Sequence, residues 1–170
     1  MTWGSKSHHL YLTFSLSLPH QLGLLSSAMS DILSLVGPYI PHTPGILPKW
    51  LLFISVVSVF NSAQTYLGGI ELTQRVYEAK PQQVTPLSAR TFGTWTLISA
   101  IIRFYGAYHL RVPQVYQITF ASYCIALFHF GTEWLIYKTV KPGKGFAGPA
   151  IVATTTVIWM WTQWNYYVSA

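Results

Sequence analysis

Long uncharged stretches separated by short polar segments dominate the pattern of this chain. Residues 50–70 and 112–132 are two stretches of 21 uncharged residues each, and the last 26 residues, 145–170, are also uncharged. Residues 91–110 carry a single charge, Arg103. Because an α-helix rises 1.5 Å per residue, about 20 apolar residues are enough to cross the hydrocarbon of a bilayer. The pattern therefore predicts four membrane-spanning helices.

The predicted spans are residues 50–67, 91–110, 115–137 and 146–168. We expect helices because lipid offers the backbone no hydrogen-bond partners. The predicted fold class is therefore all-α, an integral membrane four-helix bundle within residues 49–168. Composition agrees with this class, because 51% of the residues are apolar and 8% are charged, against about a quarter charged in soluble domains.

The region before the first span divides into two parts. Residues 1–28 are interpreted as an N-terminal extension, for which disorder is one option. A weak signal peptide is the alternative, because Lys6 precedes an apolar patch that is followed by small residues. Residues 29–48 contain four prolines, which interrupt a regular helix and favour an extended lead-in at the membrane surface.

Basic residues predict the orientation of the bundle. The loops 68–90 and 138–145 together carry six of them, and the opposite side carries three. The six are Arg75, Lys80, Arg90, Lys138, Lys141 and Lys144, and the three are Lys6, Lys49 and Arg111. Cytosolic loops are enriched in Lys and Arg, so we expect loops 68–90 and 138–145 in the cytosol. The net charge of +6 then indicates contact with anionic lipid headgroups and not with nucleic acid.

Two sequence features resemble ligand sites, and each has a structural alternative. Residues 143–148 match the G-x-G-x-x-G pattern, but a dinucleotide site needs a preceding strand and a following acid. We interpret these glycines as a flexible hinge. His129 and Glu133 are four residues apart and share a helix face, but a metal needs three or four ligands. We therefore expect an interhelical contact there, and predict no metal and no cofactor.

The charged residues within the spans are candidates for contact with partners. Depth arguments match Glu133 with Arg90 at the mouth of the second span, and leave Arg103 to snorkel outward or to pair with another protein. Polar residues also form a stripe in the first span, which favours helix packing in lipid. The complete candidate set is Asn61, Gln64, Arg90, Arg103, His129 and Glu133. No nucleophile, base and orienting group occur together, so the sequence predicts no catalytic site and no enzyme.

Several segments together resemble the fungal form of the ergosterol biosynthetic protein 28 family. The similarity covers about residues 47–168. The segments are Leu47–Ser55, Val59–Ser62, Ala89–Thr96, Ile102–Ala107, Ala126–Glu133 and Gly143–Phe146. The run Ala-Arg-Thr-Phe-Gly-Thr-Trp-Thr at 89–96 is the most specific of these.

The resemblance implies a function that composition does not. Members of that family reside in the endoplasmic reticulum membrane and tether the enzymes of sterol C-4 demethylation. These enzymes are the sterol C-4 methyl oxidase, the C-3 dehydrogenase/C-4 decarboxylase and the 3-keto sterol reductase. The expectation is therefore a non-catalytic scaffold, with self-association left open. A small four-span transporter or channel subunit is the first alternative, and a catalytic subunit is the second.

Overall fold

The computed structural model describes residues 18–168, and every regular element in that range is helical. The long helices are α1 (Leu18–Val36), α2 (Leu47–Leu67), α4 (Pro86–His109), α5 (Pro113–Thr132) and α6 (Lys144–Thr162). Short elements are η1 (Gly37–Tyr39), α3 (Glu71–Val76), η2 (Pro81–Gln83), the π-helical turn η3 (Glu133–Tyr137) and α7 (Trp164–Val168). The all-α prediction is confirmed.

The described residues fall into two compact units that divide between Ile40 and Pro41. In the first unit, α1 is continuous across the predicted boundary at residue 28 and ends at Val36. Pro38 follows within two residues and cannot continue a helix. The irregular lead-in is therefore shorter than the predicted 29–48. The apolar patch weighed as a signal peptide lies almost wholly outside the described residues.

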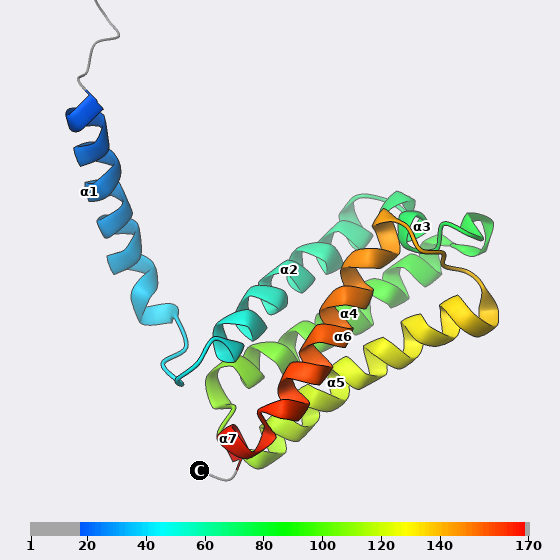
Figure 1. Ribbon diagram of the computed structural model, residues 1–170. Coiled ribbons are helices and arrows are strands. Elements are labelled where there is room, and N and C mark those ends of the chain that lie inside the picture. Colours follow the sequence, from blue (N-terminus) through cyan, green and yellow to red (C-terminus); the bar gives the residue numbers. More distant parts are fainter. Residues whose placement is uncertain (1–17, 169–170) are drawn as a thin grey trace, which may run out of the picture. The chain divides into compact units, whose positions relative to one another are not determined.

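Four antiparallel helices, α2, α4, α5 and α6, form the second unit (Figure 1). Proline occupies the first turn of three of them, as Pro48, Pro86 and Pro113, where its missing N–H costs no hydrogen bond. In α4, the Thr85 side chain accepts a hydrogen bond from the Ser88 backbone N–H, and the Ser88 hydroxyl accepts one from the Thr85 N–H. This reciprocal cap places the start of α4 five residues before the predicted span.

Small and hydroxyl side chains lie where these helices approach each other most closely. The Ser62 hydroxyl of α2 donates a 2.7 Å hydrogen bond to the carbonyl of Gly93 in α4. A Cβ at Gly93 would overlap Thr65, and a Cβ at Gly106 would overlap Thr119 of α5. Small residues of this kind allow close helix contacts in lipid. Ser58, Ser62 and Thr65 of the polar stripe predicted in the first span therefore pack within the bundle, whereas Asn61 and Gln64 are exposed.

The bundle buries hydroxyl side chains and Arg103 beside its apolar core, and it exposes many large apolar side chains. Its buried polar residues include Ser55, Ser58, Ser62, Thr65, Ser99, Arg103, Thr119, Ser122 and Thr156. Its exposed apolar residues include Phe53, Phe60, Ile98, Ile101, Phe104, Ile118, Ile125, Phe128, Ile151, Ile158 and Trp161. Among the described helices, α2 alone has both the length and the apolar composition to cross a bilayer. Composition by itself thus supports one of the four predicted spans.

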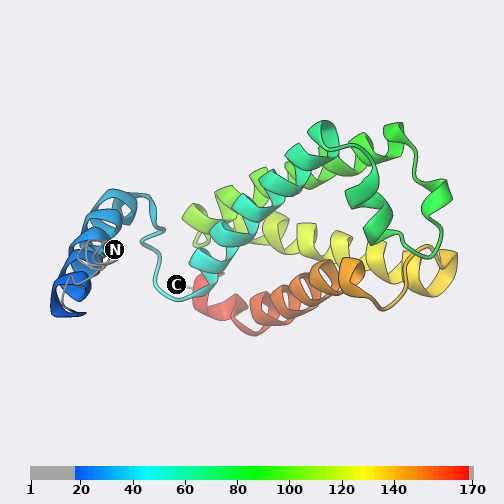
Figure 2. The same cartoon turned by 90° about the horizontal axis from the view of Figure 1, so that it is seen from above.

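The helix ends differ from the predicted spans at the end of the bundle that contains α3. The loop predicted at 68–90 contains α3 and η2, and α4 begins within it (Figure 2). In the third predicted span, the α-helix α5 ends at Thr132. The remaining residues, 133–137, form the π-helical turn η3. At the opposite end, the fourth predicted span is interrupted at Gln163 between α6 and α7.

Candidate functional site

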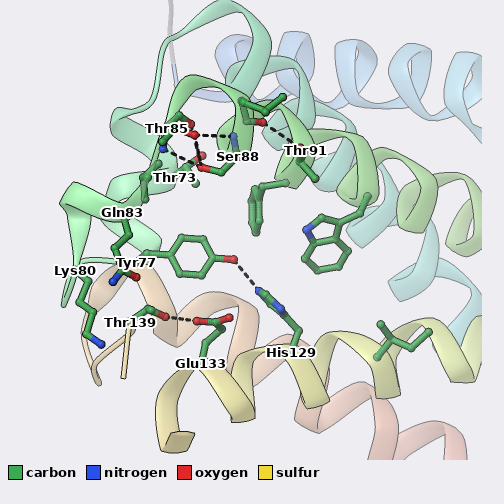
Figure 3. Close-up of a pocket in the computed structure, with 15 residues that line it drawn as sticks. Thr73, Tyr77, Lys80, Gln83, Thr85, Ser88, Thr91, His129, Glu133 and Thr139 are labelled. Carbon is green, nitrogen blue, oxygen red and sulfur yellow. Dashed lines mark hydrogen bonds between the residues drawn. The ribbon is translucent and has the colours of Figure 1, made fainter. Parts of the chain in front are cut away.

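A cavity of about 680 Å³ lies beside the connection that contains α3 and η2 (Figure 3). Its walls come from this connection, the first half of α4 and the second half of α5. The lining residues are Thr73, Tyr77, Lys80, Gln83, Val84, Thr85, Leu87, Ser88, Thr91, Phe92, Trp95, Ile125, His129, Glu133 and Thr139. The lining surface is mainly apolar. The volume of the cavity is typical of small-molecule sites, which run from about 300 to 1,000 Å³.

Hydrogen bonds fasten the α3–η2 connection to the chain that follows α5. The backbone N–H of Ala79 donates to the carbonyl of Thr139 over 3.0 Å. The Nζ of Lys80 donates to the carbonyl of Tyr137 over 2.8 Å. These bonds link two connections that are about 60 residues apart in sequence, and they hold this end of the cavity in place.

Tyr77 and His129 meet across the cavity. The Tyr77 hydroxyl lies 2.7 Å from the Nε2 atom of His129, and the two form a hydrogen bond. The His129 ring also packs edge-on against Trp95 of α4, at 5.6 Å between ring centroids. Burial raises the pKa of the Tyr77 phenol, and the nearby Glu133 carboxylate raises it further. The phenol is therefore protonated at neutral pH. The interhelical contact predicted for His129 is confirmed.

Glu133 belongs to the same cavity, and its partner is Thr139. The chain leaves η3 through Lys138, whose φ of 54° is in the left-handed region. This turn brings Thr139 back, so that its N–H donates to the Glu133 carbonyl over 3.0 Å. The Thr139 hydroxyl donates to the Glu133 carboxylate. The match of Glu133 with Arg90 was wrong, because Arg90 is exposed and a local turn already supplies the hydrogen bond.

The polar groups of the cavity are unevenly distributed. Thr73, Lys80, Gln83, Thr139 and the cap of α4 lie toward the α3–η2 connection (Figure 3). Thr73 is 2% exposed, and its hydroxyl has no hydrogen-bond partner within the described residues. The cavity therefore has a polar end with an unpaired buried hydroxyl and a mostly apolar body.

A family model described as "Erg28 like protein" matches residues 47–158, which include every residue of the cavity. The chain belongs to the Erg28 family. It is 56% identical to ergosterol biosynthetic protein 28 of Saccharomyces cerevisiae over 141 residues, which are 82% of this chain and 95% of the relative. It is 57% identical to the Candida albicans protein of that name over 131 residues, or 76% and 94% of the two chains.

More distant members extend the family beyond fungi. The human ergosterol biosynthetic protein 28 homolog is 34% identical over 121 residues, which are 71% of this chain and 86% of the relative. No solved structure matches the chain. The resemblance stated from the quoted segments is thus confirmed, and the chain is a member of a family named for ergosterol biosynthesis.

Arg103 lies inside this Erg28 bundle. It is 7% exposed, and its guanidinium carbon lies 4.0 Å from the centroid of the Tyr123 ring of α5. A cation over an aromatic face is stabilised by the negative charge of the ring face. The Nε atom of Arg103 and the hydroxyl of Tyr123 are buried without a partner among the described residues. The prediction that Arg103 snorkels outward was wrong, because its side chain is buried against Tyr123. Pairing of Arg103 with another protein stays a prediction.

Three other candidates face outward. Asn61 and Gln64 of α2 and Arg90 of α4 are exposed. Asn61 and Gln64 are three residues apart and lie on one face of the helix with Val57. The predicted set therefore separates into residues at the cavity, a residue inside the bundle, and residues on its surface.

Gly143 and Gly145 pack against α3 and the residues that follow it, whereas Gly148 has open space around it. A Cβ at Gly145 would overlap the backbone carbonyl of Arg75, and a Cβ at Gly143 would overlap the Glu78 carboxylate. Gly145 lies in the first turn of α6, so its missing side chain allows α6 to approach α3. The interpretation as a flexible hinge was wrong, because these two positions are in close contact.

Sequence reasoning identified His129 and Glu133 but missed the rest of the cavity. Tyr77 and Thr73 lie in a segment interpreted as a loop, because α3 has only six residues and too little periodicity to be recognised. Thr139 was missed because a π-helical turn has no sequence signature here. The available signal was the specific run 89–96, which contains the cavity residues Thr91, Phe92 and Trp95.

Proposed function

We propose that this chain is a non-catalytic scaffold that spans the endoplasmic reticulum membrane four times. It holds together the sterol C-4 methyl oxidase, the C-3 dehydrogenase/C-4 decarboxylase and the 3-keto sterol reductase. Family membership and the names of the relatives support a role in ergosterol biosynthesis. The particular enzymes follow from the family resemblance of the sequence. Grouping them would pass apolar intermediates along without release into the bilayer.

The distribution of side chains supports four spans. A water-soluble bundle buries its apolar residues and exposes its polar ones. In this bundle, many hydroxyl side chains and Arg103 are buried, while most of the exposed surface of the long helices is formed by large apolar side chains such as Phe60, Phe128 and Ile151. An apolar exterior of this kind suits contact with lipid tails, and buried hydroxyls suit helix association in lipid. The apolar exterior with buried hydroxyl groups is the single observation that supports the four membrane spans of the proposal.

The exposed face of α2 supports a docking role. Asn61 lies six residues before the end of α2, or about 9 Å along the axis, so in a membrane-spanning α2 its amide would lie within the hydrocarbon. An exposed amide in lipid lacks partners, and asparagine side chains form hydrogen bonds across helices. Gln64 lies on the same face. We assign this face, Asn61 with Gln64, as the surface that binds a transmembrane helix of one of the enzymes.

Deletion of the protein tests the scaffold role. We expect 4-methyl and 4-carboxy sterol intermediates to accumulate in a deletion strain, measured by gas chromatography with mass spectrometry of total sterols. Each enzyme, assayed alone in detergent, should keep its activity. A normal sterol profile in the deletion strain would overturn the proposal.

The docking surface is tested by co-purification from membranes. Asn61→Leu should reduce the recovery of one of the three enzymes with the tagged chain, without lowering the chain's thermal stability in detergent. Val59→Leu is the matched control, because Val59 is also exposed on α2 but lies on a different side of the helix from Asn61 and Gln64. Equal recovery with both variants would contradict the assignment of Asn61.

A further inference from the structure

The cavity combines a large apolar surface with a small polar region. Phe92, Trp95, Val84, Leu87 and Ile125 supply apolar surface. The polar groups gather toward the α3–η2 connection. A ligand that matches this distribution has an extended apolar body and one small polar group at its end, because an unmatched polar group on either partner would cost free energy.

Thr73 identifies where a polar atom of the ligand is needed. Its side chain lines the cavity, it is 2% exposed, and its hydroxyl has no partner among the described residues. Buried hydroxyls in native proteins almost always have a hydrogen-bond partner. A ligand oxygen at the polar end would supply one. The hydroxyl both donates and accepts, so it fits a hydroxyl or a keto oxygen.

The charges at the cavity disfavour a phosphate headgroup. Lys80 is the one Lys or Arg among the lining residues, and one of its three N–H donors is used by the Tyr137 carbonyl. Glu133 lines the same cavity and would repel an anion. Phosphate sites instead use several basic donors or free backbone N–H groups. The site therefore favours an uncharged polar group.

We propose that the cavity binds one uncharged sterol, with its 3-hydroxyl or 3-keto oxygen at Thr73 and its ring system against Phe92, Trp95 and Ile125. A sterol is a rigid, fused apolar body with a single oxygen at one end, so it matches both parts of the cavity. The choice of a sterol among apolar ligands rests on the proposed function. Sterol binding gives the scaffold a second role, which is to hold an intermediate between the enzymes.

Photolabelling of the full chain in phosphatidylcholine vesicles tests the site. The probe is a sterol with a free 3-hydroxyl, a diazirine on ring B and a terminal alkyne on its side chain. We expect saturable labelling within residues 87–95 and at Ile125, and competition by an unlabelled 4-methyl sterol. Labelling spread over the apolar exterior without saturation would overturn the proposal. So would equal competition by a phospholipid.

A pair of matched substitutions separates the cavity from the lipid-facing surface. Ile125 is 62% exposed and lines the cavity, so Ile125→Trp should fill it and reduce labelling to background. Ile118 lies two turns earlier on the same face of α5 and is 55% exposed, but it does not line the cavity. Ile118→Trp should leave labelling unchanged. An equal loss in both variants would contradict a specific site.

Thr73→Val tests the position of the oxygen. The change keeps the shape of the side chain and removes the hydroxyl, so the probe concentration for half-maximal labelling should rise about tenfold, the value of one net hydrogen bond. Removal of an unpaired buried hydroxyl should not lower the stability of the sterol-free chain. Unchanged half-maximal labelling would overturn the placement of the sterol oxygen at Thr73.

The failure of this inference can be distinguished from that of the scaffold proposal. The Ile125→Trp chain should still co-purify with the three enzymes, because Ile125 is on α5 and the docking surface is on α2. A wild-type chain that binds the enzymes but shows no saturable labelling would overturn the sterol site alone. A chain that is labelled but recovers none of the enzymes would overturn the scaffold.

Discussion

The Tyr77 hydroxyl lies 2.7 Å from the His129 Nε2 atom, although 52 residues separate them in the sequence. This hydrogen bond joins the segment between α3 and η2 to the end of α5. It crosses the cavity near its polar end (Figure 3). The α3–η2 connection is thereby held against the bundle at a point remote from the covalent links at its own ends.

The raised pKa of Tyr77 predicts a loss of stability at alkaline pH. Below about pH 10, the phenol is protonated in both the folded and the unfolded chain, so its contribution to stability is constant. Above pH 10, the unfolded chain loses the proton first, because burial keeps the folded phenol neutral. The free energy of unfolding should therefore fall as pH rises, by at most about 1.4 kcal/mol per pH unit from this residue.

The measurement compares thermal unfolding in detergent between pH 8 and pH 12 for the wild type and Tyr77→Phe. The variant should lose less stability than the wild type above about pH 10. Tyr66→Phe is the control, because Tyr66 is exposed and its hydroxyl bonds to Thr94 at the surface. Parallel pH curves for the wild type and Tyr77→Phe would contradict the burial of this phenol.

Glu133 should be energetically coupled to Thr139 and not to Arg90. The Thr139 hydroxyl donates to the Glu133 carboxylate, and a hydrogen bond to a charged group contributes about 1.5–3 kcal/mol. A double-mutant cycle of Glu133→Gln with Thr139→Val should therefore show coupling of about 1 kcal/mol or more, measured by unfolding in detergent. The cycle with Arg90→Gln should show none. Coupling to Arg90 alone would favour the depth argument over the observed turn.

The Tyr123 ring, and not its hydroxyl, should matter to Arg103. The guanidinium lies over the ring face, and the hydroxyl has no partner among the described residues. Tyr123→Phe keeps the ring and should change the unfolding free energy by less than about 1 kcal/mol. Tyr123→Leu leaves the buried charge without an aromatic face and should cost about 2 kcal/mol or more. Thermal unfolding of the two variants side by side tests this, and equal losses would rule out the ring contact.

Two glycines of the G-x-G-x-x-G pattern should respond in opposite directions to alanine. Gly145→Ala places a Cβ against the Arg75 carbonyl and should destabilise the chain by about 1–3 kcal/mol, because backbone atoms cannot move aside. A Cβ at Gly148 meets nothing within 4 Å, and that residue lies inside α6. Gly148→Ala should therefore stabilise the chain by about 0.5–1 kcal/mol. Equal effects, measured as shifts in melting temperature, would contradict the close contact between α6 and α3.

Much of the helical framework could be predicted because its signals are local. Gaps between charges located the centres of α2, α4, α5 and α6, since a long uncharged stretch and the rise per residue are both local properties of a helix. The stripe of small and hydroxyl side chains on α2 indicated a packing face, because the period of a helix is also a local property. The sequence segments also identified the Erg28 family.

The site depended on contacts between distant segments, and these only the tertiary structure decided. The charge pattern indicates how deep Glu133 lies but not how the chain turns after it, so the choice of Thr139 over Arg90 followed from η3 and the left-handed Lys138. The Arg103 and Tyr123 contact depends on the rotation of α4 against α5. Tyr77 lies next to His129 because it directly follows α3, a six-residue helix that is too short to give a periodic signal in the sequence. Periodicity determines a face and a length, whereas a cavity depends on where several faces meet.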